Sequence, residues 1–179
     1  IAAAVIQKLT GQLQSPRKLL DALGQAASEG RIAVWSAVPA EQEIIETTPL
    51  AHIVPDDDAP SAAVVLNNLA GNKMDYYLRR EIEYVADKCD GDMRNSTVTV
   101  RLSNTAPDRP LPDEVAGTMG LVGGIPINAP PGTMVTSVRL IATKGARLTG
   151  VTSNGKRTSA ITNMENGRPS FEVQLAIPP

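Results

Sequence analysis

The chain has 179 residues with only one Trp, three Tyr and one Phe, so it is long enough for one sizeable core, which must be packed mainly by aliphatic residues. Its 17 basic and 19 acidic residues give a formal net charge of −2, which excludes the excess of Lys and Arg that a nucleic-acid partner requires. A single cysteine excludes an intrachain disulfide. No Cys–His spacing suits zinc, so we expect no metal and no other cofactor. No apolar run reaches the roughly 20 residues that cross a bilayer, so we expect no direct membrane insertion by this chain.

Residues 1 to 60 are expected to form an α/β flank of helices with one short strand. A first helix is predicted by apolar residues that recur at three-to-four spacing: Val5, Ile6, Leu9 and Leu13. The chain enters this helical pattern directly, at Ile1 and without a methionine. We therefore expect the flank to be the end of a larger domain, whose earlier part is absent from this chain.

A second helix, a strand and a third helix complete the expected flank. Ser15 suits an N-cap whose hydroxyl accepts a free amide, Pro16 suits the first helical position, and Gly30 suits the left-handed residue that ends a helix. The apolar segment 31–37 lies between a glycine and a proline, which favours a short buried strand. Pro39 then opens a third, short helix with acidic residues near its positive end.

An acidic connection and a change of hydrophobic period follow the flank. The connection 48–60 carries the run Asp56-Asp57-Asp58, which we interpret as solvated because consecutive aspartates lack the alternate spacing of a calcium loop. Segment 61–69 predicts a first strand, and 70–73 predicts a hairpin turn. Segment 74–86 alternates between apolar and charged residues, which predicts an antiparallel strand with one buried face. The residues expected to point inward are Met74, Tyr76, Leu78, Ile82, Tyr84 and Ala86.

The rest of the chain continues the two-residue period. Further strands are predicted at residues 96–104, 134–142, 146–153 and 157–162, with a last strand through Phe171, Val173, Leu175 and Ile177. The segment 105–132 is rich in proline and glycine, so we expect a long surface connection, and Asn154-Gly155 predicts a type I′ hairpin. The expected fold class is α+β, with the flank over residues 1–60 and an antiparallel β-sandwich domain of about seven strands, Ig-like with Greek-key connections, over residues 61–179.

Arg80 is the strongest candidate for a ligand contact. It lies in register with the apolar residues of segment 74–86, so alternation points its guanidinium toward the apolar face, where a charge must be paired or solvated. One interpretation is an anion site, in which Arg79 or Arg80, together with Lys73, binds a phosphate or a sugar carboxylate through forked guanidinium donors. The other interpretation is structural: an internal ion pair, or a sheet edge where Arg80 reaches solvent.

Three asparagines form a second candidate, and no catalytic residue is assigned. Asn67, Asn68 and Asn72 present amides to a ligand in one interpretation and are ordinary turn residues in the other. His52 has no orienting partner or nucleophile signalled nearby, and Cys89 lies beside aspartates that blunt the reactivity of a thiol. Pairing of Cys89 with a cysteine outside this chain stays open.

Several segments resemble a known protein family. They are the stretch from Asn67 to Arg80, the stretch from Thr97 to Pro107, and shorter pieces at residues 33–36, 41–42 and 146–151. Together they are similar to the C-terminal part of the domain of unknown function 4012 family, found in membrane-anchored envelope proteins of high-GC Gram-positive bacteria. The resemblance implies an extracytoplasmic location, with a membrane anchor in a segment absent from this chain. It implies no reaction.

The resemblance also implies partners and frames two functional hypotheses. The expected partner is the family's N-terminal half, which is absent here. That half is distantly similar to the LytR-CpsA-Psr ligases of envelope glycopolymers. An envelope glycopolymer or another envelope protein is a further expected partner. The first hypothesis is a non-catalytic structural or interaction module, because no nucleophile with a base, no paired carboxylates and no metal cluster can be assembled from these residues. The alternative is the C-terminal half of a transferase that handles lipid-linked phosphate glycans, with Arg79 and Arg80 binding an anion.

Overall fold

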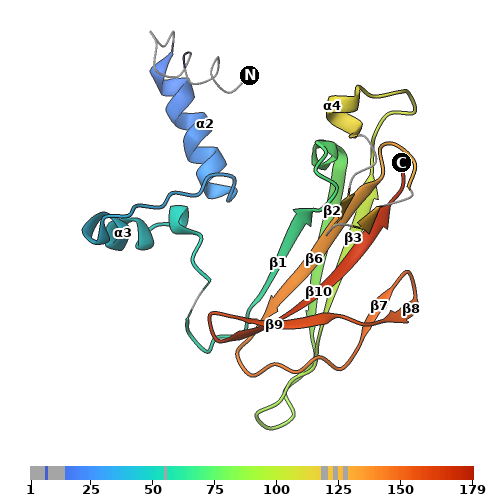
Figure 1. Cartoon of the computed structure of the whole chain (residues 1–179). Helices are drawn as coiled ribbons and strands as arrows, with labels where there is room; N and C mark the ends of the chain where they lie inside the picture. The colour runs from blue at the N-terminus through green and yellow to red at the C-terminus, as the bar shows by residue number, and fades with distance from the viewer. Residues whose placement is uncertain (1–6, 8–14, 55, 118–120, 123–124, 127–128) are drawn as a thin grey trace. The chain divides into compact units, whose positions relative to one another are not determined.

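The computed structural model describes residues 7, 15–54, 56–117, 121–122, 125–126 and 129–179. The chain divides into an N-terminal unit, residues 1–55, and a β unit, residues 56–179, and each is described by itself (Figure 1). This division lies slightly before the boundary expected at residue 60. The helix predicted through Val5 and Leu13 lies outside the described residues.

Helices make up the regular structure of the N-terminal unit. They are α2 (Pro16–Ser28), α3 (Pro39–Glu46) and the short 3₁₀ helix η1 (Pro49–Ala51). A proline occupies the first turn of α2 and of α3, as predicted, and Gly30 has the positive φ of 68° that ends α2. Ser15 precedes α2, but its side chain accepts no capping hydrogen bond, so that part of the prediction is wrong.

The strand predicted at residues 31–37 does not form. The segment runs without regular structure from α2 to α3, and the amide of Val34 donates to the carbonyl of Leu50 in η1 at 2.9 Å. A strand needs a neighbouring strand to satisfy its backbone donors and acceptors. The described residues of the N-terminal unit supply no such neighbour.

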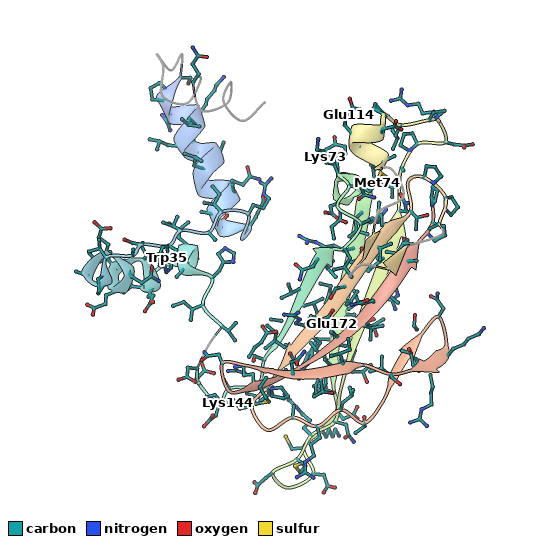
Figure 2. The ribbon with its side chains drawn as sticks, in the orientation of Figure 1. Trp35, Lys73, Met74, Glu114, Lys144 and Glu172 are labelled. Carbon is teal, nitrogen blue, oxygen red and sulfur yellow. The ribbon has the colours of Figure 1, made fainter. Side chains whose placement is uncertain are left out.

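No described residue of the N-terminal unit is buried. Half or more of its large apolar side chains are exposed, and the described remainder are only half-buried. The exposed ones are Leu20, Leu23, Val34, Trp35, Val38, Ile44 and Ile53. Trp35, labelled in Figure 2, is 76% exposed. The helices are therefore formed, but their apolar side chains find no core among the described residues of this unit.

The β unit is built on a four-stranded antiparallel sheet in the order β1-β6-β10-β9. The strands are β1 (Ala62–Asn68), β6 (Met134–Ala142), β10 (Arg168–Ile177) and β9 (Ile161–Glu165). Register places Leu66 beside Val138 and Val138 beside Val173, so apolar side chains of three strands share one face. β1 lies within the predicted strand 61–69, and β6 has the bounds predicted for it. Because β1 pairs with β6, the hairpin predicted at residues 70–73 does not form.

A hairpin of β2 (Leu78–Ala86) and β3 (Ser96–Asn104) packs against this sheet, with β3 in contact with β10. In Figure 1 the hairpin lies behind β6 and β10. The side-chain amide of Asn104 links the two parts by donating to the carbonyl of Gly132 at 2.9 Å and to that of Ile177 at 3.4 Å. β3 has the bounds predicted for it.

The predicted strand at residues 74–86 is only partly correct. Its first four residues form the 3₁₀ helix η2 (Met74–Tyr77), and the strand begins at Leu78. The amide of Met74 donates to the side chain of Asn72, which turns the chain, and the side chain of Met74 is fully buried (Figure 2). β2 pairs with β3 in a two-stranded sheet, so its other edge has no strand beside it among the described residues. Three side chains that were expected to point inward are exposed: Tyr76, Ile82 and Tyr84.

Short elements complete the β unit: α4 (Asp113–Ala116), β4 (Leu121–Val122), β5 (Ile125–Pro126), β7 (Val151–Ser153) and β8 (Lys156–Thr158). The first three lie in segment 105–132, which was expected to be irregular. The strand predicted at 146–153 is reduced to β7, and the one at 157–162 is divided between β8 and β9. The hairpin at Asn154-Gly155 forms as predicted, with φ values of 49° and 75°.

The predicted α+β class is confirmed as a mixture of helices and antiparallel sheets. Among the described residues, eight strands have three residues or more, so the expectation of about seven is too low. In the part of the chain that the structure describes, the buried apolar side chains belong to the β unit: Met74, Ala116, Met134, Ile141 and Phe171. In the described part of the chain, no helix is long and apolar enough to cross a membrane.

Candidate functional site

A hollow of about 370 Å³ opens on the β unit. It is lined by Leu66 of β1, Asp75 of η2, and Leu78 and Arg80 of β2. β1 is the outer strand of the four-stranded sheet and β2 belongs to the hairpin, so the hollow lies where the rims of the two sheets meet. It combines two aliphatic side chains with two side chains of opposite charge.

Arg80 shares a face of β2 with Leu78, as alternation predicts, but it is exposed. It forms no hydrogen bond or ion pair with any residue that the structure describes. Of the two structural interpretations, the internal ion pair is therefore absent from the described part, and a sheet edge in contact with solvent is observed. An unpaired guanidinium keeps its five N–H donors available to a ligand.

The asparagine side chains beside the hollow are engaged within the protein. Nδ2 of Asn68 lies 2.9 Å from both the carbonyl and the side-chain oxygen of Asn72, and 3.1 Å from Oδ2 of Asp75. Nδ2 of Asn72 in turn donates to the carbonyls of Ala116 at 3.2 Å and Thr133 at 3.3 Å. These bonds engage Asn68, at the end of β1, and Asn72 within the protein, and they hold the carboxylate of Asp75 at the rim of the hollow.

Of the predicted anion-binding residues, only Arg80 lines the hollow. Arg79 lies on the opposite face of β2, with Nη2 3.4 Å from Oε1 of Glu81. Lys73 precedes η2, next to Met74, and its exposed side chain does not line the hollow (Figure 2). Asn67 is exposed on the face of β1 opposite to its neighbours in sequence. The predicted constellation of two arginines and a lysine is therefore not brought together.

Two residues of the hollow carried no functional signal in the sequence. Leu66 is an ordinary apolar residue of a strand. Asp75 was expected on the charged outer face of segment 74–86, because strict alternation places it opposite to its neighbours. Formation of η2 removes that alternation, and the hydrogen bond from Asn68 then determines where the carboxylate lies.

The acidic run, interpreted as a solvated connection, is held by two basic side chains that come much later in the sequence of the β unit, Lys144 and Arg168. Nζ of Lys144, labelled in Figure 2, lies 2.8 Å from Oδ1 of Asp56 and 3.7 Å from Oδ1 of Asp58. Arg168, which is only 1% exposed, donates to the carbonyl of Asp57 at 2.6 Å. The hydrogen bond and charge of Lys144 lower the pKa of Asp56, and Asp56 raises the pKa of Lys144. The carboxylates stay exposed, yet the connection has a defined attachment.

A second ion cluster crosses the four-stranded sheet. Arg139 of β6 lies 2.8 Å from Glu165 of β9 and 2.9 Å from Glu172 of β10. The hydroxyl of Ser137 and the guanidinium of Arg139 lower the pKa of Glu172, labelled in Figure 2, while Glu172 and Glu165 raise the pKa of Arg139. The cation is shared by two carboxylates, so we interpret this cluster as structural.

The remaining candidates form no reactive arrangement in the described part of the chain. Nε2 of His52 lies 3.1 Å from the carbonyl of Ile32, and Cys89 is a free, exposed cysteine. Among the residues described, no three His, Cys, Asp or Glu side chains are placed to hold a metal ion.

Comparison of the chain with protein families, with curated proteins and with solved structures finds no match. The resemblance to the domain of unknown function 4012 family therefore stays a prediction.

Proposed function

We propose that this chain is a non-catalytic structural and interaction module of an exported, membrane-anchored cell-envelope protein. One observation carries the proposal: the N-terminal unit forms helices, yet none of its described residues is buried. Short helices are marginal in water unless an apolar face packs against a neighbour. The N-terminal unit is therefore suited to packing against another polypeptide segment.

The exposed apolar side chains supply the contact area for that packing. Trp35, Ile44 and Leu20 are 76%, 69% and 67% exposed. Removing apolar surface from water contributes roughly 25 cal/mol per Å², so burial of three such side chains stabilises an interface by several kcal/mol. Exposed apolar surface of this kind is typical of interaction sites.

We assign the partner to a part of the same protein that precedes this chain. The short pieces 33–36 and 41–42, which contribute to the family resemblance, both lie in the N-terminal unit. In the family the corresponding partner is the N-terminal half. The extracytoplasmic location and the membrane anchor in an absent segment are supported by the same resemblance.

We propose that the β unit is a sandwich of Ig-like, Greek-key type that acts as the scaffold of the module. Pairing of β6 with both β1 and β10, and packing of the β2–β3 hairpin through β3, support this arrangement. An envelope glycopolymer or another envelope protein is the further partner that such a scaffold would present or contact.

One observation favours the alternative function, the C-terminal half of a transferase that handles lipid-linked phosphate glycans. Arg80 is unpaired among the described residues and lines a hollow, where an anionic group can reach its donors. Arg79 no longer contributes, because it faces the other side of β2 and lies beside Glu81. Reactive groups would have to come from the absent N-terminal half.

Trp35 provides the test, because it is the only tryptophan of this chain. We would compare the isolated chain with the full-length protein after labelling with fluorotryptophan, and assign the fluorine signal of this residue with Trp35→Phe. We expect the signal to be accessible to solvent in the isolated chain and shielded in the full-length protein.

A matched control uses Tyr76, which is 87% exposed in the β unit. A tryptophan introduced there by Tyr76→Trp, in the Trp35→Phe background, should stay accessible in both proteins. Equal exposure of Trp35 in the isolated chain and in the full-length protein would overturn the proposed packing. Recovery of the full-length protein in the cytosolic fraction of its own cells would overturn the envelope location.

A further inference from the structure

We propose that the hollow in the β unit binds a compact aliphatic zwitterion, whose anionic group contacts Arg80, whose ammonium group contacts Asp75 and whose apolar part covers Leu66 and Leu78. Every residue involved belongs to the β unit. Binding is therefore independent of what packs on the N-terminal unit.

The hollow has the size of a small-molecule site, with a lining that is more polar than apolar. Its volume of about 370 Å³ lies near the lower end of the roughly 300–1,000 Å³ that ligand pockets occupy. Such pockets usually combine apolar walls with a few convergent polar groups. Here Leu66 and Leu78 supply aliphatic surface, and Asp75 and Arg80 supply one charge of each sign.

The two charges do not neutralise each other. Asp75 and Arg80 line the same hollow but form no ion pair, and Arg80 has no partner among the described residues. The hydrogen bond from Asn68 uses Oδ2 of Asp75, which leaves Oδ1 as an acceptor at the rim. A ligand that carries both an anion and an ammonium group satisfies both side chains at once.

The acidic side of the hollow is organised before any ligand binds. Asn68 holds Asp75, and Asn72 connects this pair to the carbonyls of Ala116 and Thr133 on the far side of the turn. A carboxylate that is already positioned loses little freedom when it accepts a ligand's donor. Arg80, which is exposed and has no partner among the described residues, can then turn toward the anionic group.

Asp75 also determines the ligand class. An anion bound to Arg80 shares the hollow with the negative charge of Asp75, and like charges at short range repel. An ammonium group facing Asp75 replaces this repulsion with attraction. The hollow therefore favours zwitterions over inorganic phosphate or a simple carboxylate, which separates it from the phosphate site that the transferase alternative requires.

The first experiment is an NMR titration of the isotope-labelled chain with two zwitterions, leucine and ε-aminocaproate. Their counterparts without the ammonium group, isocaproate and caproate, and inorganic phosphate are titrated in parallel. We expect saturable shifts of the amides around Asp75 and Arg80, with at least one zwitterion bound about tenfold or more tightly than its carboxylate counterpart, as loss of one hydrogen bond to a charged group predicts. Equal binding of a carboxylate counterpart or of phosphate would overturn the proposal, and so would the absence of saturable shifts with both zwitterions.

The second experiment compares Arg80→Gln and Asp75→Asn with the control Arg79→Gln, which changes the same residue type on the opposite face of β2. We expect the first two substitutions to weaken zwitterion binding about 10- to 100-fold each and the control to leave it unchanged. Asn at position 75 still accepts the hydrogen bond from Asn68, so the turn is retained, and unchanged urea unfolding of each variant verifies this. An equal loss in Arg79→Gln would show that the effect comes from overall charge, and the proposal would fail.

Discussion

The N-terminal unit and the β unit contain similar apolar residues but use them differently. In the N-terminal unit, prolines start two helices, yet no described side chain is buried. In the β unit, β6 has a partner strand on each side, and its residues Met134 and Ile141 are only 2% and 4% exposed. Local signals are sufficient to form a helix, whereas a core requires elements that lie far apart in the sequence to meet.

This comparison indicates where the stability of the chain resides. The central sheet joins residues 62–68 to 136–142, and 134–141 to 170–177, so its contacts are long-range. Folding of the β unit must therefore offset a large loss of chain entropy through burial of apolar surface. The described residues of the N-terminal unit bury less apolar surface. Substitutions in this unit should therefore change the free energy of unfolding less than substitutions in the β unit.

The largest contrast is expected between Met134→Ala in β6 and Leu20→Ala in α2. Met134 is buried, so its truncation leaves a cavity and should lower the free energy of unfolding by about 2–5 kcal/mol. Leu20 is 67% exposed, and its truncation should change the free energy of unfolding by about 0.5 kcal/mol or less. Urea denaturation of both variants measures the difference, and losses of equal size would contradict the assignment of the core to the β unit.

The next contrast concerns the attachment of the acidic run. Arg168→Met removes buried, charge-assisted hydrogen bonds to Asp57 and Ser61 and should destabilise the β unit by about 2–3 kcal/mol. Lys144→Met removes an ion pair with Asp56, whose side chain is 79% exposed, and should lower the urea midpoint much less than Arg168→Met does. Urea midpoints of both variants, with limited proteolysis of the connection, test this order. A larger effect of Lys144→Met would show that the exposed pair, not the buried arginine, holds the run.

A smaller contrast, of opposite sign, involves two glycines. Gly117 has a φ of 73°, and an added Cβ would lie 2.9 Å from Cβ of Asn72, so Gly117→Ala should destabilise the β unit. The expected cost is about 1–3 kcal/mol. Gly24 lies within α2 with nothing near its missing Cβ, so Gly24→Ala should stabilise the helix by about 0.5–1 kcal/mol. Helix content from circular dichroism and urea midpoints would measure the two effects, and effects of the same sign would refute the contrast.

The smallest expected effect is a pH dependence in the β unit. Ser137 and Arg139 lower the pKa of Glu172, so its carboxylate stabilises the folded state at pH above the ordinary value of a glutamate, about 4.3. This contribution falls as the pH drops below that value and is lost once the pH passes through the lower pKa of the folded protein. Glu172→Gln should therefore flatten the decrease of the urea midpoint between about pH 6 and about pH 3. The same slope in wild type and variant would show that Glu172 does not contribute.

Part of the candidate site was predictable because Arg80 lies in a regular strand. Alternation along β2 placed it on the same face as Leu78, and the structure agrees. Asp75 was not predictable, since it lies in η2, where the two-residue period no longer holds. Its position depends on Asn68 and on the turn that Asn72 organises, which are contacts rather than a pattern.

The sequence by itself determined the local events in this protein. Pro16 and Pro39 start helices, Gly30 ends one, and Asn154-Gly155 forms a hairpin turn, because each limits the backbone angles of its own neighbourhood. Alternation of apolar and polar residues located the long strands, because successive side chains of a strand point to opposite faces.

Only the tertiary structure decided which segments meet. It paired β1 with β6 instead of β2, attached the acidic run to Lys144 and Arg168, and brought Leu66 to the hollow beside Asp75. The observed pairing is the one in which the whole chain buries the most apolar surface and satisfies the most hydrogen bonds. A local sequence pattern does not contain this information, because it depends on segments that are distant in the sequence.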